Sequence, residues 1–479
     1  MSQDGLTWSY DPFSPAAVDS AWSQDPDIDD VTVVARQRLE VSPADEVKVE
    51  FLAEGAFNKV YKVLINNHKP YILRVSLPIN PRNKTECEVA TIDFVRSKTS
   101  LPVPAILAYD STNSNSIGFE YILMEYMPGV QMVKVWHKLP WEKQVYVIDQ
   151  LVHYLSELYQ HSFEEIGGLR QDPKQNFNLG SIASVQLSWF ERVKDTTPKG
   201  PFNNEQVWID ATLLHVEHES QRLHGQATNG DKDGKSEYGP LLANIKRLQA
   251  AVPRLLAKNL PLDTDKASTA RCILYHPDLD LQNILLDPDS LKITGIIDWE
   301  NVFVVPTGAA CELPALLGPY EPVRSEEPSK DDYEDDESSD DEIENDEADF
   351  DAEGKDHKYW DHLLEYQQTE LRPIFLEKMS QLCPGWVDAY NNSEGLRDLL
   401  SVLRLIDNPW EVKDVRAWLD SVEAGERRSF RELRLESEDG NADATSSTAE
   451  DEMTDLVKQE QFVSLWTPAM LPSLDGATC

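Results

Sequence analysis

The sequence predicts an α+β protein with two lobes, a small antiparallel β-lobe followed by a larger lobe made mainly of helices. Three observations support this prediction. From Val47 onward, short runs of alternating apolar residues are separated by polar turns, which is typical of antiparallel strands. After Pro128 and Gly129, apolar residues recur with helical spacing. A second short β-region, residues 272–305, lies between helical segments.

The small lobe is expected to cover residues 47–127, with five strands and one helix. Its strand-like runs are residues 47–52, 59–65, 71–75, 106–109 and 119–126. Between the third and fourth runs, residues 85–98 carry Val89, Ile92 and Val95 at the spacing of one helix face. Because strands joined by short turns pair with each other, the lobe is predicted to be a five-stranded antiparallel sheet with one packed helix.

The larger lobe is expected to cover residues 128–435. An apolar stripe from Val145 to Leu158 predicts its first long helix. Further helical patterns lie near residues 203–222, 241–258, 358–380, 394–406 and 410–423. Within this lobe, residues 275–300 are predicted to form a polar loop and a β-hairpin. Two lobes of this kind suggest a cleft between them.

The ends and one internal segment are not expected to join the core. Residues 1–46 are polar and acidic, and they are predicted to form a loosely ordered arm with one helix near residues 31–39. Residues 325–356 contain 18 acidic residues and two lysines, so charge repulsion predicts a disordered insertion. Residues 436–479 form a second acidic tail.

The chain is strongly acidic, with 44 Lys and Arg residues against 85 Asp and Glu residues and a formal net charge of −41. Nucleic acids and anionic lipids attract Lys and Arg, so we expect binding to neither. The sequence has no run of about 18 apolar residues, and no membrane insertion is expected. The acidic insertion could instead recruit a basic protein partner.

Compartment is predicted from the N-terminus and the cysteines. The N-terminus lacks an apolar stretch and has no basic residue before Arg36, which opposes both a secretory signal and a mitochondrial presequence. The five cysteines include no Cys-x-x-Cys pair, so they predict no zinc site and no redox motif. An odd number of cysteines in a long chain favours reduced thiols. We therefore expect a cytoplasmic location.

The strongest chemical signal is a polar loop between two apolar strands. Asp278 and Asn283 are five residues apart in this loop, and Asp298 follows the next strand. A carboxylate beside an acceptor hydroxyl can take its proton during phosphoryl transfer. Magnesium prefers oxygen ligands and completes its coordination with phosphate oxygens. Asp278 is therefore the candidate catalytic base, and Asn283 and Asp298 are candidate magnesium ligands in a site for ATP.

The spacing His-x-Asp-x-x-x-x-Asn, followed by a strand and Asp-Trp-Glu, resembles the signature of the aminoglycoside phosphotransferase and choline kinase family. The resemblance covers residues 49–305 and is greatest with fungal members, including proteins similar to altered inheritance of mitochondria protein 9. It implies a bilobal, protein-kinase-like fold, binding of ATP and Mg²⁺, and phosphorylation of a small hydroxyl compound. It implies the same roles for Asp278, Asn283 and Asp298. Family analogy alone suggests a mitochondrial association.

Two features of the small lobe agree with a nucleotide site. Gly55, Phe57 and Asn58 lie in a turn between two strands, where a phosphate-covering loop belongs. Arg74 is on the third strand and Glu88 on the following helix, the places of the phosphate-binding lysine and its glutamate partner in protein kinases. Arginine can bind a carboxylate or a phosphate through two nitrogens at once.

The end of the small lobe supplies a candidate hinge, but some features depart from the kinase pattern. Glu125 and Met127 end the last strand, where backbone groups would meet adenine. The phosphate turn has one glycine rather than three, and Asp280 stands where many relatives have histidine. A carboxylate there would repel phosphate unless it is paired or turned away. These departures leave open an ATP-binding pseudokinase as an alternative. The acidic segments leave open a second alternative, an acidic interaction protein with a kinase-like scaffold.

Overall fold

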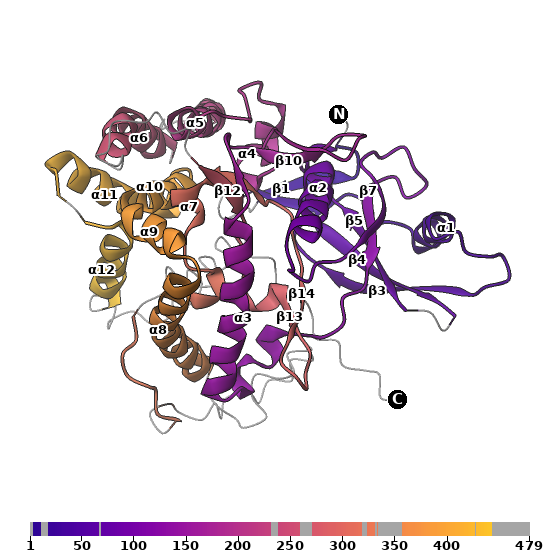
Figure 1. Ribbon diagram of the computed structural model, residues 1–479. Helices are drawn as coiled ribbons and strands as arrows, with labels where there is room; N and C mark the ends of the chain where they lie inside the picture. Colours follow the sequence, from indigo (N-terminus) through magenta and orange to yellow (C-terminus); the bar gives the residue numbers. More distant parts are fainter. Residues whose placement is uncertain are drawn as a thin grey trace.

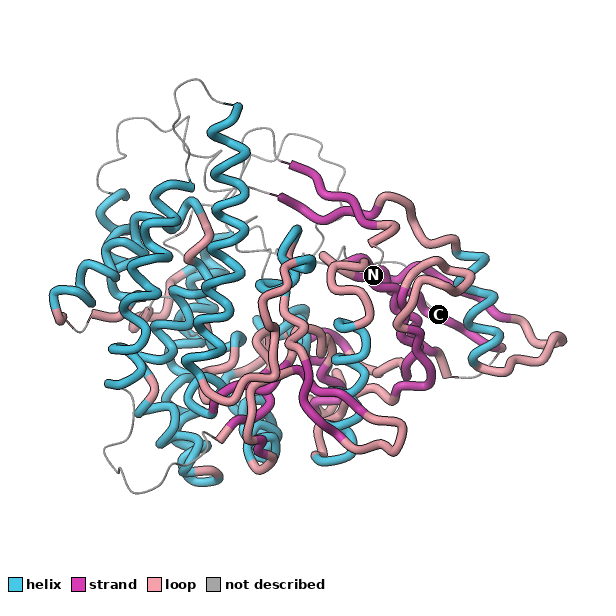
Figure 2. Tube along the Cα trace, turned by 90° about the horizontal axis from the view of Figure 1, so that it is seen from above, coloured by secondary structure: helices cyan, strands magenta, loops and turns pink. Residues whose placement is uncertain are grey.

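The structure, a computed structural model, describes residues 3–10, 18–66, 69–230, 238–258, 271–318, 323–330, 333, 357–426 and 428–442. A β-sheet forms one lobe and long helices form the other (Figure 1). The view from above gives the same division, with most helices on one side of the molecule (Figure 2). From Val47 onward the elements follow the predicted order, with the strands of the sheet and the helix at residues 83–98 before the helical lobe.

One antiparallel sheet of five strands, in the order β3-β4-β5-β7-β6, forms the small lobe. Neighbouring side chains of β7 point to opposite faces. Leu123 is buried in one core with Leu73 of β5, and Ile122 is buried in another with Val89 of α2. The elements are β3 (Val47–Glu54), β4 (Asn58–Ile65), β5 (Tyr71–Ser76), α2 (Asn83–Lys98), β6 (Ile106–Asp110) and β7 (Glu120–Glu125).

The N-terminal segment is built into this lobe, where the sequence predicts a loosely ordered arm. Its described part forms a hairpin and a helix, β1 (Leu6–Tyr10), β2 (Val18–Trp22) and α1 (Ile28–Arg38). Asp27 caps α1 by accepting the backbone N–H of Asp29 at 2.8 Å. Val31 and Ala35 lie one turn apart and are completely buried against the face of the sheet that carries Leu73.

Long helices make up most of the larger lobe. Helix α3 packs against α8, and α5 packs against α6, so the lobe is built from packed helix pairs. The stripe predicted for the first helix is buried at Ile148, Leu151 and Val152 of α3. The helices are α3 (Trp141–Tyr159), α4 (Val185–Ser188), α5 (Glu205–Gly230), α6 (Tyr238–Lys258), α7 (Thr307–Ala310), α8 (His357–Leu382), α9 (Pro384–Asn392), α10 (Glu394–Leu405), α11 (Val412–Ala424) and α12 (Phe430–Ala442). Short 3₁₀ turns are η1 (Met132–Lys134), η2 (Trp136–Lys138), η3 (Phe190–Lys194), η4 (Leu281–Asn283), η5 (Ala315–Leu317) and η7 (Pro409–Glu411).

The β-region predicted at residues 272–305 is present as strands β12 to β15, which belong to two small sheets, and the larger lobe also contains a separate hairpin of β10 and β11 that was not predicted. One sheet has the order β15-β12-β9 and the other the order β14-β13-β8. Ile284 pairs with Ile296, so the residues before β13 and after β14 lie side by side. The strands are β8 (Val130–Gln131), β9 (Ser162–Phe163), β10 (Gly168–Gln171), β11 (Phe177–Gly180), β12 (Cys272–Tyr275), β13 (Ile284–Leu286), β14 (Ile293–Ile296) and β15 (Phe303–Pro306).

The acidic segments lie largely outside the described residues. Of the predicted disordered insertion 325–356, the structure describes residues 325–330 and Tyr333. Of the acidic tail 436–479, it describes residues 436–442, which belong to α12. Within the described ranges, no helix is both long and apolar enough to cross a membrane.

Candidate active site

The loop after β12 brings together the candidate base and one candidate metal ligand. Asn283 Nδ2 donates to Asp278 twice, at 2.9 Å to the carbonyl oxygen and at 2.8 Å to Oδ2. The backbone N–H of Asp278 donates to His276 Nδ1 at 3.3 Å. Because the amide nitrogen of Asn283 is used in this way, its Oδ1 is the atom of that side chain that can bind a cation.

Asp280 caps the 3₁₀ turn η4 of this loop. One of its carboxylate oxygens accepts the backbone N–H of Leu281 at 2.6 Å. The carboxylate is therefore turned toward its own loop. An acidic residue at this place is compatible with phosphate if its carboxylate is paired or turned away, and Asp280 meets the second condition. Its charge still acts on Asp278, because burial and then the charge of Asp280 raise the pKa of Asp278 to about 6.

His276 contacts both the loop of Asp278 and Trp299. Burial lowers its pKa to about 4, so its ring is neutral near pH 7. The ring packs edge-on against Trp299, with centroids 4.9 Å apart, and the Trp299 indole N–H donates to the carbonyl oxygen of Ile296 at 2.9 Å. These contacts fix the loop of Asp278 against the end of β14.

A buried ion pair in the small lobe lies next to the second candidate metal ligand. Arg74 on β5 pairs with Glu88 on α2, and only 7% of Arg74 and 2% of Glu88 is exposed. Nη1 of Arg74 also lies 3.7 Å from Oδ1 of Asp298, which follows β14 in the larger lobe. The backbone N–H of Ile297 donates to the carbonyl oxygen of Asn283 at 2.9 Å, so Asn283 and Asp298 lie at the mouth of one hairpin.

A second buried ion pair lies beside the first, and the sequence analysis missed it. Lys84 Nζ is 2.6 Å from Glu300 Oε2, and Asn58 Nδ2 donates to the same oxygen at 2.9 Å. Burial opposes the charge of Glu300, but Lys84 and Arg74 hold its pKa below the usual value. A signal was present, because Lys84 and Glu88 are four residues apart on one face of a helix and Glu300 closes the Asp-Trp-Glu motif.

The phosphate turn is closed by its own backbone and packed by Phe57. The N–H of Gly55 donates to the carbonyl oxygen of Asn58 at 2.9 Å. The Phe57 ring is buried with Leu77, and it packs edge-on against Trp189 of the larger lobe at 6.1 Å. Of the three residues predicted here, Asn58 is thus the one joined to the ion-pair cluster by hydrogen bonds.

The predicted hinge lies between β7 and β8. The Glu125 carboxylate accepts the backbone N–H of Ala105 at 3.4 Å, so this side chain braces the end of β7. Met127 packs closely on Gly295 of β14, where an added Cβ would lie 3.0 Å from Met127 Cβ. Among the hydrogen bonds of the described residues, none uses the backbone of Met127, which suits a segment that contacts an adenine ring.

The electrostatics of the cluster fit a divalent cation. Oδ1 of Asp298 is buried and accepts no hydrogen bond within the described part of the chain. The backbone of Asp298 has φ of 61°, a left-handed conformation that is unfavourable for a residue with a side chain and is concentrated at functional sites. Burial and the charge of Glu300 raise the pKa of Asp298 well above its usual value.

The charge balance of the cluster also favours a cation. The cluster contains more acidic side chains than basic ones. The acidic residues are Glu88, Asp278, Asp280, Asp298 and Glu300, and the basic residues are Arg74 and Lys84.

A metal held here would need ligands from outside the protein. Across the described ranges, no group of three or more His, Cys, Asp or Glu side chains is arranged to hold a metal by itself. Magnesium bound together with a nucleotide commonly has only one or two carboxylate ligands, and phosphate oxygens and water complete its coordination. Asp298 and the amide oxygen of Asn283 match this type of site.

Similar chains are found both among curated fungal proteins and among solved structures. A subtelomeric hrmA-associated cluster protein of Aspergillus fumigatus is 29% identical over 308 residues, which are 55% of this chain and 59% of that protein. Altered inheritance of mitochondria protein 9 of Clavispora lusitaniae is 24% identical over 299 residues, 55% of this chain and 49% of that protein. The chain thus spans only about half to three-fifths of the length of these relatives. Among solved structures, ADP-bound aminoglycoside phosphotransferase APH(2'')-Ib aligns with 82% of this chain and 97% of its own at 13% identity and a TM-score of 0.43.

The family profile covers the small lobe and the loop of Asp278 together. The profile described as the phosphotransferase enzyme family matches residues 48–307, more than half of the chain. This range includes the phosphate turn, the Arg74 and Glu88 pair and the loop of Asp278. The chain therefore belongs to the phosphotransferase enzyme family.

Proposed function

We propose that this protein is an ATP- and magnesium-dependent phosphotransferase whose acceptor is a hydroxyl group of a small molecule. The observation that supports it best is the joint arrangement of Asp278, Asn283 and Asp298 at one β-hairpin beside the buried Arg74. Membership of the phosphotransferase family supports the reaction class. Nucleotide specificity, the metal and the acceptor class belong to the proposal.

In this proposal the residues have separate roles. Asp278 orients the acceptor hydroxyl and takes its proton, and a pKa near 6 leaves it mostly ionised at neutral pH while making it a stronger base than an ordinary aspartate. Arg74 contacts the nucleotide phosphates, and Glu88 holds it in place. Asn283 and Asp298 would hold magnesium, which when bound neutralises charge on the phosphates.

Nucleotide contacts would come from the small lobe and the hinge. The turn that contains Gly55, Phe57 and Asn58 would cover the phosphates, and the backbone of Met127 would contact adenine, with Glu125 bracing the strand before it. We propose that the protein works in the cytoplasm. An association with mitochondria is the alternative suggested by relatives such as altered inheritance of mitochondria protein 9.

The nucleotide site can be tested without knowing the acceptor. Thermal unfolding would be followed with ATP, with and without magnesium, in the wild type and in Asp298→Ala. Ligand at one hundred times its dissociation constant adds about 2.7 kcal/mol to the free energy of unfolding. We expect a magnesium-dependent rise in melting temperature in the wild type that Asp298→Ala loses.

A matched variant separates binding from transfer. Asp278→Ala should retain the ATP-induced shift, since the base contacts the acceptor rather than the nucleotide. It should lose phosphoryl transfer in a screen of hydroxyl compounds that the wild type phosphorylates. An equal turnover in Asp278→Ala would contradict the assignment of the base, and a wild type that binds ATP but transfers to no hydroxyl would favour a pseudokinase.

A further inference from the structure

The ion pair of Lys84 and Glu300 is unusual in its burial and in the segments that it joins. Both side chains are 8% exposed, and the two charged atoms are 2.6 Å apart. Lys84 lies in the first turn of α2 in the small lobe, whereas Glu300 lies two residues after Asp298 in the larger lobe. Buried ion pairs contribute little to net stability, because their attraction is offset by the loss of hydration. Such a pair is better suited to fixing one geometry.

The geometry that it fixes is that of Asn58, the last residue of the phosphate turn. Asn58 Nδ2 donates to Glu300 Oε2 at 2.9 Å. Its Oδ1 accepts from Lys84 Nζ at 3.0 Å and from Ser76 Oγ at 2.8 Å. Every one of these partners lies within a buried site, so the amide is held by charge-assisted bonds at both of its ends.

This turn has an additional need for side-chain support. Between β3 and β4 it contains only one glycine, Gly55, and so has few positions at which the backbone can approach a phosphate closely. Side chains must therefore set the distance between this turn and the loop that carries Asp298. Within the described ranges, the hydrogen bond that connects the turn directly to the loop after β14 is that of Asn58 to Glu300.

We propose that Lys84 and Glu300 are positioning residues that latch the phosphate turn, through Asn58, onto the loop that carries Asp298. The latch sets the distance between the two halves of the nucleotide site before any ligand binds. This inference rests on the proposed function for the role of the turn, but its geometry is independent of that role.

The latch can be tested on the nucleotide-free full-length chain by hydrogen exchange. We would compare the wild type with Lys84→Met, with Glu300→Gln and with the double variant. Lys84→Met should raise exchange in residues 54–60 about tenfold, the size expected for the loss of a charge-assisted hydrogen bond. Glu300→Gln retains an acceptor for Asn58 and should give a smaller increase.

The double variant covers the case in which Lys84→Met leaves Glu300 buried without a partner and weakens the whole fold. Removal of both charges avoids this penalty. For a latch, the double variant should fold, and its turn should exchange no faster than that of Lys84→Met, because the two residues act as one unit. Arg82→Met is the matched control, since Arg82, the residue just before the same helix, forms a partly exposed pair with Glu86 at 3.3 Å. It should leave exchange in the turn unchanged.

Nucleotide affinity supplies the second measurement. Lys84→Met should weaken ATP binding about tenfold relative to the wild type and to Arg82→Met, the same factor as the loss of one charge-assisted hydrogen bond. Unchanged exchange in residues 54–60, or an increase no larger than that in β6, would overturn the latch. If the wild type bound no ATP, the proposed function would fall, and the exchange result alone would decide whether the latch exists.

Discussion

Asp278 and Asp280 show how two neighbouring carboxylates can have different tasks. Asp278 faces Asn283, while Asp280 is bound to the backbone N–H of its own turn. The cost of this arrangement is electrostatic, since the charge of Asp280 is the second cause, after burial, of the raised pKa of Asp278. Asp280, which departs from the expected pattern, therefore raises the pKa of the proposed base.

We predict that Asp280→Asn lowers the pH at which the enzyme becomes active. In the proposed reaction Asp278 acts as a base only when it is ionised, so the rate should rise with pH through its pKa, which is about 6. Removal of the neighbouring negative charge lowers that pKa, and the acid limb of the pH profile should move to lower pH. The amide oxygen introduced by the substitution would still cap η4.

The measurement is the rate of phosphoryl transfer, or of uncoupled ATP hydrolysis, between pH 4.5 and 8 (roughly the range around that pKa) at saturating magnesium. Asp289→Asn is the control, because Asp289 is an exposed residue of the turn between β13 and β14. An acid limb that stays in place in Asp280→Asn would show that the charge of Asp280 does not raise the pKa of Asp278.

At the scale of elements, sequence periodicity predicted the parts whose pattern is local. The hairpin of β13 and β14, with Asn283 before it and Asp298 after it, follows directly from two short apolar runs and the turn between them. The same reasoning missed the hairpin of β1 and β2 and underestimated α1. In α1, the buried residues are Val31, Val34 and Ala35, and charged residues lie between and around them. The sequence pattern of α1 therefore gives only a weak sign of a buried helix face, and the sheet that covers this face cannot be read from the sequence.

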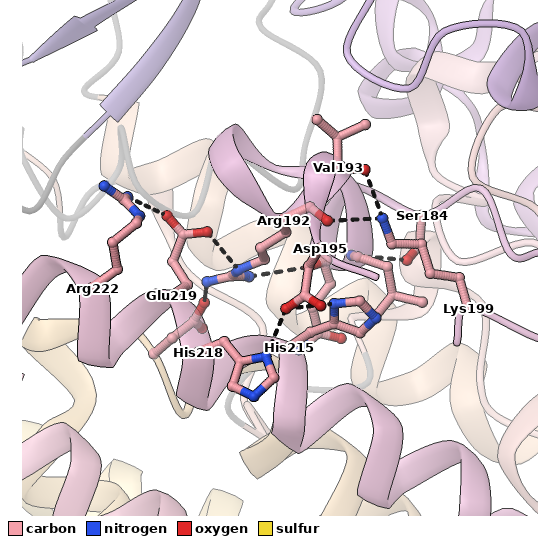
Figure 3. Close-up of polar contacts among 12 residues, drawn as sticks. Ser184, Arg192, Val193, Asp195, Lys199, His215, His218, Glu219 and Arg222 are labelled. Atoms are coloured by element: carbon pink, nitrogen blue, oxygen red, sulfur yellow. Dashed lines mark hydrogen bonds and ion pairs between the residues drawn. The ribbon is translucent and has the colours of Figure 1, made fainter. Parts of the chain in front are cut away.

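Elements of the larger lobe are joined by a buried polar cluster that periodicity does not show. Figure 3 shows Arg192 and Arg222 pointing toward Glu219, and His215 and His218 pointing toward Asp195. These contacts tie η3 and the segment after it to α5. Arg192 also pairs with Asp407, which lies beyond α10.

We predict that Arg192→Met destabilises the protein by about 2 kcal/mol, because Asp407 loses its pairing with Arg192 and the buried Glu219 is left with Arg222. The side chains of Arg192 and Glu219 are 8% and 6% exposed. Urea unfolding would measure the change. Lys194→Met is the control, since Lys194 forms an exposed ion pair with Glu191 in the same turn and should change stability by less than about 0.5 kcal/mol. Similar values for the two variants would show that the cluster contributes little.

At the scale of the whole molecule, contacts within the described ranges join the two lobes at several places, three of which differ in how far the sequence predicts them. Arg74 reaches Asp298, Lys84 reaches Glu300, and aromatic side chains of the N-terminal hairpin reach the larger lobe. The sequence could predict the residues of the first contact from the motif, but it could not predict the other two. Contacts between segments far apart in the chain depend on how the two lobes pack. Neither residue spacing nor composition predicts that packing.

The N-terminal hairpin of β1 and β2 packs beside the phosphate turn and against the larger lobe. Trp8 packs edge-on against Trp189 at 5.0 Å and against Phe190 at 5.4 Å, both in the larger lobe. Trp22 and Leu6 pack on the cluster that contains Phe57. The hairpin therefore contacts the turn on one side while the Lys84 and Glu300 pair holds Asn58 on the other.

We predict that Trp8→Ala loosens the hairpin and the phosphate turn together. Each lost aromatic pair corresponds to about 0.5–1.5 kcal/mol, so stability should fall by about 1–3 kcal/mol. Hydrogen exchange should rise in β1, β2 and residues 54–58, because Trp189 loses its contact with Trp8 while remaining the partner of Phe57. Trp410→Ala, at a residue that is 45% exposed, is the control and should change neither quantity appreciably. A rise in exchange confined to β1 and β2 would mean that the turn is held by Lys84 and Glu300 alone, and that the hairpin only covers it.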